Sequence, residues 1–249
     1  MDEIMIRSTA DGTMQPSLWR GARSPEKRPL LVGLHTWSYD RFNQEGILLP
    51  WAEKYDLNLI LPEFRGPNLA ENPDKTLACG SFHAMQDIRD AVDWAVREGG
   101  ADPGEVYLYG ASGGGHMALM MAGFCPEVFA AVAAFVPITD LQRWAEENPH
   151  YRPHILACCG GSVEEMAKRS PISHIARIAE ANVKIFHGKY DPSVPYTHST
   201  RLFQAVSELA PGSRVFLDIF AGGHETDEDA ALAWFLSQHR KKQNRTVSS

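Results

Sequence analysis

The chain has 249 residues, of which 44% are apolar and 22% charged, and its formal net charge is −7. This length and apolar content are enough for one large α/β core, and the acidic balance argues against nucleic acid as a partner. No apolar run approaches the roughly 18 residues of a membrane span, so a membrane partner is not expected either.

The compartment is inferred from the amino terminus and the cysteines. The first seven residues lack the basic start and apolar stretch of a signal peptide. The four cysteines contain no Cys-x-x-Cys spacing, and adjacent Cys158-Cys159 does not suit zinc. We interpret all four as free thiols in a reducing compartment, and therefore predict a cytoplasmic protein.

Predicted strands and helices alternate along the chain. Alternating residues at 2–9 and 14–20 flank a turn signal, Ala-Asp-Gly-Thr, and predict a hairpin. Short apolar runs then predict buried strands, and the amphipathic or capped segments between them predict helices. Further strands are expected at 30–35, 57–61, 106–109, 130–136, 183–187 and 214–220, and helices at 46–56, 81–97, 113–123, 196–209 and 228–239.

This alternation predicts the α/β class. It implies a mostly parallel eight-stranded sheet with helices on both faces, and the N-terminal hairpin would form its antiparallel edge. We expect residues 1–249 to form a single domain, with a cap-like insertion at about 137–182.

The strongest motif lies in the stretch 105–123. An apolar, β-prone run is followed by Gly-Ala-Ser-Gly-Gly at 110–114 and then by small, apolar residues suited to a buried helix. This strand–turn–helix context around G-x-S-x-G is typical of a nucleophile elbow. Ser112 would present its hydroxyl at a helix N-terminus, where the partial positive charge favours a developing oxyanion.

Functional residues in such sheets gather where the strands end. Ser112 follows the central strand, Asp191 follows the strand after the insertion, and His224 follows the last strand. This order is the one expected of α/β-hydrolases, in which the serine attacks, the histidine moves its proton and the aspartate orients the imidazole. Asp140 also follows a strand and is an alternative acid, although it can equally cap the next helix.

Four segments together resemble one family. They are Phe64-Arg65-Gly66, Gly110-Ala111-Ser112-Gly113-Gly114, Ser170-Pro171-Ile172, and the run from His187-Gly188 to Asp191-Pro192-Ser193-Val194-Pro195. They resemble the Arg-Gly loop, the nucleophile segment, the end of the cap and the acid loop in the prolyl oligopeptidase-like branch of the α/β-hydrolases. The resemblance implies the α/β-hydrolase fold and gives Asp191 and His224 the acid and base positions. Peptidases of this branch usually carry a β-propeller before the hydrolase domain. Too few residues precede the first central strand here, so we expect none.

The oxyanion loop departs from the family pattern. The family often has His-Gly-Gly where this chain has His35-Thr36-Trp37. We expect this loop to supply one oxyanion donor through the backbone N–H of Thr36 or Trp37, beside that of Gly113. The hydroxyl of Tyr39 is an alternative donor, although packing suits it as well.

Five side chains are candidates for the substrate pocket: His35, Tyr39, Arg65, Trp144 and Tyr151. Arg65 could bind an acidic group of the substrate or a structural carboxylate such as Asp87. The two aromatic residues of the insertion suit a substrate ring and plain packing equally well. His116 is expected to join a polar network in the core. The remaining histidines lack metal spacing, so we predict no metal and no cofactor.

We therefore predict a serine hydrolase that cleaves carboxylic esters, with a small-molecule or sugar ester as substrate. A peptidase or aminoacyl hydrolase is the first alternative. A non-catalytic binding protein on the same fold is the second, although all three catalytic positions are filled. The sequence leaves open whether the protein is a homo-oligomer.

Overall fold

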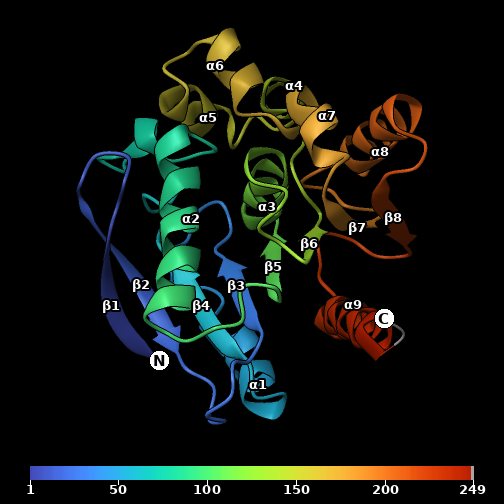
Figure 1. Ribbon diagram of the computed structural model, residues 1–249. Helices are drawn as coiled ribbons and strands as arrows, with labels where there is room; N and C mark the ends of the chain where they lie inside the picture. The colour runs from blue at the N-terminus through green and yellow to red at the C-terminus, as the bar shows by residue number, and fades with distance from the viewer. Residues whose placement is uncertain (248–249) are drawn as a thin grey trace.

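The computed structural model describes the backbone of residues 1–247 and the side chains of residues 1–238. The described chain forms one eight-stranded sheet in the order β1-β2-β4-β3-β5-β6-β7-β8 (Figure 1). The strands are β1 (Asp2–Arg7), β2 (Met14–Arg20), β3 (Leu30–Leu34), β4 (Asn58–Pro62), β5 (Val106–Ala111), β6 (Ala131–Phe135), β7 (Asn182–Gly188) and β8 (Arg214–Phe220).

The predicted mixed sheet is confirmed. Strands β1 and β2 pair antiparallel, β2 pairs antiparallel with β4, and every pair from β4 to β8 is parallel. The β1–β2 hairpin forms one edge of the sheet. Asp11 and Gly12 lie in its turn, and Gly12 has a φ of 79°, a conformation that favours glycine. The central strands are apolar throughout because helices cover both of their faces.

Two helix layers enclose the sheet. Helices α2 (Phe82–Arg97), α3 (Gly113–Phe124), α7 (Ile175–Ile178) and α8 (Thr197–Leu209) pack on one face, and α1 (Glu45–Lys54) and α9 (Glu228–Val247) on the other. Alternation along β5 divides its side chains between these layers: Val106 and Leu108 join the first, and Tyr107 and Tyr109 the second. Each layer of helices therefore packs against every second side chain of a strand.

The element boundaries agree with the sequence pattern to within a few residues, with one larger difference. Ser81 caps α2 by accepting a hydrogen bond from the N–H of Ala84, as its position before the helix predicts. The last helix is longer than the 228–239 expected and ends at Val247, although its side chains beyond residue 238 lie outside the described residues.

The segment between β6 and β7 forms a cap of short helices. These are α4 (Leu141–Glu147), α5 (Arg152–Cys158), α6 (Val163–Lys168), the 3₁₀ turn η2 (Pro171–His174) and α7. They gather above the sheet (Figure 1), and a third apolar cluster, which contains Trp37, Trp144 and Val194, lies beneath them. The short 3₁₀ turn η1 (Lys75–Leu77), from the loop after β4, lies against α5.

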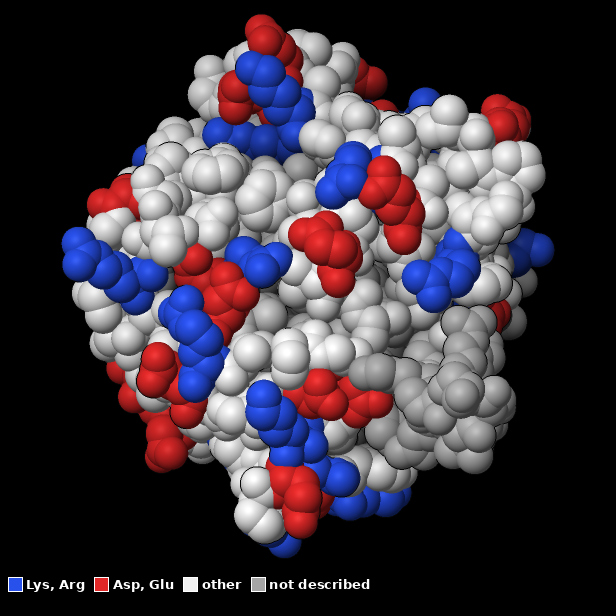
Figure 2. Space-filling view, in the orientation of Figure 1, with Lys and Arg blue, Asp and Glu red and all other residues white. Residues whose placement is uncertain are grey.

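The surface seen in Figure 2 mixes charges of both signs, and basic and acidic side chains alternate across it. Within the described residues, no helix combines the length and apolarity needed to cross a membrane.

Candidate active site

A strained turn presents Ser112. Its φ of 54° and ψ of −116° lie outside the regions that non-glycine residues prefer, and its N–H donates to the carbonyl oxygen of Phe135 at the end of β6. The flanking glycines are needed because a Cβ at Gly110 would overlap the carbonyl of Gly114. A Cβ at Gly114 would lie 2.5 Å from the carbonyl oxygen of Leu34. The turn therefore fixes the serine hydroxyl at the carboxyl edge of the sheet, where α3 begins.

Three side chains from three strand ends meet there. His224 Nε2 lies 3.0 Å from Ser112 Oγ, and His224 Nδ1 lies 2.7 Å from Asp191 Oδ2. With Nδ1–H donating to the carboxylate, Nε2 is left to accept the serine proton. The Asp191 carboxylate is fully buried, whereas 28% of the His224 side chain is exposed. The arrangement thus has a buried acid and a base that faces the solvent side of the site.

The loop after β7 holds the carboxylate in a set direction. Asp191 Oδ1 accepts the backbone N–H groups of Ser193 at 2.8 Å and Val194 at 2.9 Å. The buried imidazole of His187 lies beneath, with Nε2 3.4 Å from Asp191 Oδ2 and 2.8 Å from the carbonyl oxygen of Val194. Burial alone would raise the pKa of Asp191. The hydrogen bonds from His187, His224 and Val194 outweigh it and hold that pKa well below the ordinary value.

The histidine loop rests on the end of β7. A Cβ at Gly188 would overlap the carbonyl oxygen of Gly223, so only glycine allows the loop to lie this close. The N–H of Tyr190 donates to the carbonyl oxygen of Gly222 at 2.8 Å, and that of Lys189 donates to Phe220 at 2.9 Å. The acid loop and the histidine loop are therefore bonded to each other through the main chain.

The hydrogen bonds of the oxyanion loop distinguish the two predicted donors, Thr36 and Trp37. Asn43 Oδ1 accepts the N–H of Thr36 at 2.9 Å, so that group is already engaged. The backbone of Trp37 instead lies against Gly113, where an added Cβ would overlap the Trp37 nitrogen. The N–H of Gly113 is in the first turn of α3, where no helical carbonyl is available to it. The backbones of Trp37 and Gly113 therefore lie against each other next to Ser112.

Of the five predicted pocket residues, three are buried with partners inside the protein. His35 is 2% exposed and stacks on Phe64 with ring centroids 3.8 Å apart, and its ring nitrogens face the carbonyl oxygens of Thr36 and Glu63. Trp144 is 1% exposed, and Arg65 is 4% exposed. Tyr39 is 60% exposed beside the oxyanion loop, and Tyr151 is half-buried and stacks on Trp144 at 4.8 Å.

Arg65 takes the structural partner that the sequence suggested. Its Nε lies 2.6 Å from Asp87 Oδ2, and its Nη1 lies 2.8 Å from Asp11 Oδ2 in the hairpin turn. Its Nη2 adds a bond to Ser8 Oγ at 3.2 Å. The guanidinium therefore joins the hairpin to α2, and its donors are directed into the protein.

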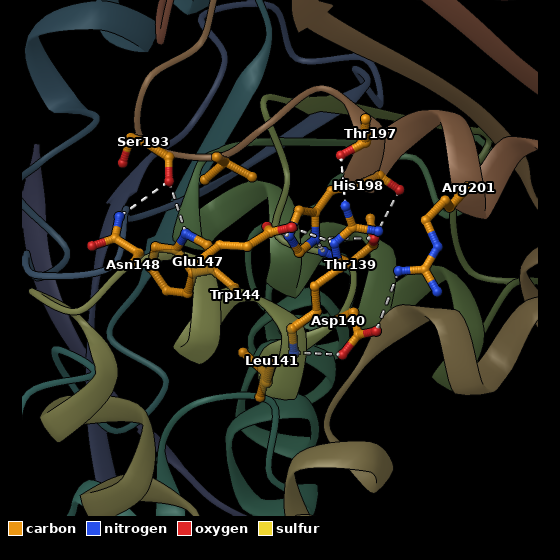
Figure 3. A network of polar contacts seen from close by, with 12 residues as sticks. Thr139, Asp140, Leu141, Trp144, Glu147, Asn148, Ser193, Thr197, His198 and Arg201 are labelled. Atoms are coloured by element: carbon orange, nitrogen blue, oxygen red, sulfur yellow. Dashed lines mark hydrogen bonds and ion pairs between the residues drawn. The ribbon is translucent and has the colours of Figure 1, made fainter.

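A network of polar contacts joins α4 to the acid loop and to α8 (Figure 3). Trp144 Nε1 and Asn148 Nδ2 both donate to the carbonyl oxygen of Ser193, at 2.9 and 3.1 Å. His198 Nε2 donates to Glu147 Oε2 at 3.1 Å, and its Nδ1 accepts the N–H of Thr139 at 3.2 Å. Trp144 also meets the Trp37 ring edge-on at 4.9 Å. One cap residue therefore contacts both the acid loop and the oxyanion loop.

The alternative candidates have other partners. Asp140 Oδ1 caps α4 by accepting the N–H of Arg143 at 3.1 Å, and it makes no contact with His224 within the described residues. His116 is fully buried, and its Nε2 donates to the carbonyl oxygen of Arg169 at 2.7 Å. The four cysteines are free and buried. Across the described side chains, no group of three or more His, Cys, Asp or Glu residues is arranged to hold a metal.

A cavity of about 560 Å³ opens beside the histidine loop. Carboxylates and aromatic rings dominate its lining, which comprises Ile47, Trp51, Phe186, Asp218, Phe220, Glu225, Thr226, Asp227, Glu228, Asp229 and Ala230. No sequence motif indicates this cavity, because its walls come from α1, β7, β8 and the start of α9, which are distant along the chain. Glu225 directly follows His224 in the chain, but Ser112, Asp191 and His224 are not among the lining residues.

Comparison with known proteins shows the family to which the chain belongs. The model of the prolyl oligopeptidase family matches residues 82–239. An acylamino-acid-releasing enzyme of Arabidopsis thaliana is 29% identical over 166 residues, which cover 60% of this chain and 21% of that protein. Acetylxylan esterase A of Emericella nidulans is 27% identical over 156 residues, which cover 58% of this chain and 49% of that protein.

A solved structure shares the fold. The uncomplexed acylaminoacyl peptidase of Pyrococcus horikoshii matches with a TM-score of 0.72 and 19% identity, over 89% of this chain and 37% of that one. The chain thus spans between about a fifth and a half of the length of these relatives.

Proposed function

Because the chain belongs to the prolyl oligopeptidase family of serine hydrolases, we propose that it cleaves carboxylic esters through an acyl-enzyme formed on Ser112. The observation that carries this proposal is the continuous contact from Ser112 through His224 to Asp191, at 3.0 and 2.7 Å. A nucleophile, a base and an orienting carboxylate within hydrogen-bond reach are what acyl transfer requires.

In the first half of the proposed reaction, Ser112 Oγ attacks the ester carbonyl carbon while His224 Nε2 accepts its proton. The resulting imidazolium is stabilised by Asp191, whose depressed pKa keeps it ionised at neutral pH. His224 then gives the proton to the leaving alkoxide, and the alcohol departs. In the second half, His224 takes a proton from water, the hydroxide attacks the acyl carbon, and the proton returns to Ser112.

The tetrahedral oxyanion would be held by the backbone N–H groups of Trp37 and Gly113. Their backbones lie against each other beside Ser112, while Asn43 occupies the N–H of Thr36. Two such donors, fixed before the substrate arrives, stabilise charge that appears only in the transition state.

Two observations support an ester with a polar alcohol. An alkoxide departs from a tetrahedral intermediate more readily than an amide nitrogen does, so an ester is the less demanding substrate for this triad. The cavity that contains Glu225, the residue after His224, is lined by carboxylates, which can accept hydrogen bonds from hydroxyl groups, and by the rings of Trp51 and Phe220, which can pack on an apolar sugar face. The relative from Emericella nidulans is named an acetylxylan esterase, which makes an acetylated sugar a reasonable first substrate.

A peptidase is the second candidate, and the names of other relatives favour it. The acylamino-acid-releasing enzymes of Arabidopsis thaliana and Rattus norvegicus match 60% and 79% of this chain. The same three side chains would cleave an amide if the pocket held an N-acylated residue.

The deciding experiment is a parallel hydrolysis panel on the wild type, Ser112→Ala and Ser213→Ala, a control in the turn at the opposite end of the sheet. The substrates are p-nitrophenyl acetate, butyrate and octanoate, acetylated xylose, and the p-nitroanilides of acetyl-alanine and Gly-Pro. Ester turnover that disappears only in Ser112→Ala supports the proposal. Anilide turnover with the same dependence, exceeding that of the esters, replaces it with the peptidase. Absence of turnover and of fluorophosphonate labelling would leave a binding protein.

A further inference from the structure

Three buried thiols meet where the cap contacts the loop after β4. Cys79 lies two residues after η1, whereas Cys158 and Cys159 lie at the end of α5, and these two segments are side by side in the upper part of Figure 1. No more than 2% of any of the three is exposed, and all belong to the apolar cluster beneath the cap. The thiol of Cys79 is hydrogen-bonded to both of the others. Two thiols of this group are therefore close enough to join in a disulfide while both segments stay folded.

Main-chain contacts hold the two segments together. Arg169 Nη1 donates to the carbonyl oxygens of Ala78 and Cys158, both at 3.2 Å, so one nitrogen joins the residue before Cys79 to the end of α5. Cys79 has a φ of 50°, in the left-handed region that non-glycine residues occupy only when their surroundings hold them there. The position of this thiol is therefore imposed by the fold around it.

Within the group, Cys159 is the thiol best suited to react. The hydrogen bond from the Cys79 thiol lowers the pKa of Cys159, against the opposing effect of burial, and the positive charge of Arg169 lowers it further. Hydrogen bonds to Cys158 and Cys159 raise the pKa of Cys79 instead. Because the thiolate is the reactive form of cysteine, an oxidant should attack Cys159 first, while Cys79 remains a thiol.

Cys159 can be approached from solvent at the end of α5. The two residues that follow it, Gly160 and Gly161, are exposed, and a Cβ at either would meet no atom within 4 Å. Cys159 thus lies one residue from the surface although its own side chain is covered. Cys125, the fourth cysteine, is buried at the end of α3, where its thiol is hydrogen-bonded to the Arg89 side chain. It supplies a matched control.

Hydrogen bonds connect Cys79 to the oxyanion loop. The N–H of Cys79 donates to Asn68 Oδ1 at 2.8 Å, and the N–H of Asn68 donates to the carbonyl oxygen of Trp37 at 2.8 Å. On the cap side, Tyr151 directly precedes α5 and stacks on Trp144. A change in the position of Cys79 would therefore reach Trp37 through a single residue.

We propose that Cys159 and Cys79 form a peroxide-sensitive thiol pair, whose disulfide joins the cap to the loop behind Trp37 and slows hydrolysis at Ser112. The Cys159 thiolate attacks one oxygen of hydrogen peroxide, the O–O bond breaks, and a sulfenic acid forms while the departing hydroxide takes up a proton. The sulfur of Cys79 then attacks the sulfenic sulfur, the S–O bond breaks, and water leaves with the Cys79 proton. The two thiols have then lost two electrons, and hydrogen peroxide has been reduced to two waters.

The disulfide should lower kcat at least tenfold. An S–S bond is shorter than the contact between two thiols, so Cys79 moves toward α5 and Asn68 moves with it. The movement displaces Trp37, whose N–H is a proposed oxyanion donor, and a shift of about 1 Å in a positioned group can reduce the rate by about 100-fold. This loss rests on the proposed function of Ser112, whereas formation of the bond does not.

The first test treats the whole, folded chain with hydrogen peroxide and then measures two quantities. Mass spectrometry of unreduced digests should show the peptide of Cys79 linked to the peptide of Cys159. The kcat on p-nitrophenyl acetate should fall at least tenfold and recover with dithiothreitol. Because the linked peptide is detected without turnover, a failure of the thiol pair is distinguishable from a failure of the proposed function. Absence of the linked peptide would overturn the pair, and a linked peptide with unchanged kcat would overturn its effect on the site.

Single substitutions identify the partners. Cys79→Ser and Cys159→Ser should keep their kcat after peroxide. Cys125→Ser and Cys158→Ser should lose activity as the wild type does. Dimedone, which reacts with sulfenic acids, should label Cys159 in Cys79→Ser, where the second step is blocked. Equal inactivation of Cys79→Ser and the wild type, or a disulfide that needs Cys158 in place of Cys159, would contradict this assignment.

Discussion

The indole nitrogen of Trp144 donates a hydrogen bond of 2.9 Å to the carbonyl oxygen of Ser193, and so ties the cap to the loop that carries Asp191. The N–H of Ser193 in turn holds the Asp191 carboxylate. The other side of the same indole packs against Trp37, whose backbone lies beside Gly113. A buried cap residue therefore orients two parts of the site without touching the reacting atoms.

Trp144→Phe should lower kcat roughly fivefold and leave KM almost unchanged. The phenyl ring keeps the packing but loses the N–H, and one hydrogen bond contributes about 1 kcal/mol. Steady-state kinetics on p-nitrophenyl acetate will measure the effect. Trp94→Phe is the matched control because Trp94 packs edge-on against Trp19, away from the cap. Equal kcat values for the two variants would remove the positioning role from Trp144.

Gly113→Ala should lower kcat by about two to three orders of magnitude. The new methyl group overlaps the Trp37 nitrogen, so it moves one of the two proposed oxyanion donors, and a lost donor has a cost of this size. Gly46→Ala is the control because a Cβ there meets no atom within 4 Å. Circular dichroism of both variants will show whether they are folded. A folded Gly113→Ala protein with wild-type kcat would mean that the oxyanion hole lies elsewhere.

Arg65→Ala should destabilise the fold by about 3–5 kcal/mol without raising KM. Removal of the guanidinium leaves Asp87 buried and unpaired, which is the costly way to break an ion pair. Urea unfolding will give the free energy, and Arg89→Ala, which breaks the half-exposed pair with Asp93, should cost about 0.3–0.5 kcal/mol. A raised KM in a stable Arg65→Ala protein would restore the substrate-binding interpretation.

Stability should fall as the pH drops from about 6.5 toward 4. Burial lowers the pKa of His198 to about 4, against the opposing effect of Glu147, and burial also lowers that of His116 to about 4. Between these pH values the two histidines therefore become protonated in the unfolded chain but stay neutral in the folded chain. Each histidine contributes a slope of up to about 1.4 kcal/mol per pH unit.

Urea unfolding at several pH values will test this slope. His198→Gln keeps a donor to Glu147 and removes one titrating ring, so its stability should depend less on pH than that of the wild type. His150→Gln, at an exposed position, should keep the wild-type slope. An unchanged slope in His198→Gln would show that the ring is already protonated in the folded protein.

The sequence predicted the sheet and the positions of the three catalytic candidates, but not the side-chain contacts around them. The mostly parallel sheet follows from the alternation of apolar runs with helical segments, and the meeting of Ser112, Asp191 and His224 follows from their places after parallel strands. These are properties of the backbone path, which local patterns encode well. The contact of Arg65 with Asp87 was one of the two alternatives that the sequence left open.

The sequence could not predict the contacts that side chains make with the main chain of other loops. Whether Thr36 or Trp37 has a free N–H depends on Asn43, which folds back onto the loop from seven residues away. The choice between substrate pocket and packing for Trp144 depends on how α4 is rotated, and its partner is a carbonyl oxygen, which leaves no trace in the sequence. No short motif could reveal either contact.

The residues around the reacting centre come from segments that follow β3, β5, β7 and β8, so no stretch of the chain can form the site by itself. Assembly therefore waits for contacts between distant parts of the chain, such as that between Ser112 and His224, which lie 112 residues apart. A molecule whose last strand has not docked would retain most of its helix content and still lack His224 in its place. During refolding, hydrolytic activity should therefore return more slowly than the circular dichroism signal. The difference between the two rates would measure how long the last strand takes to dock.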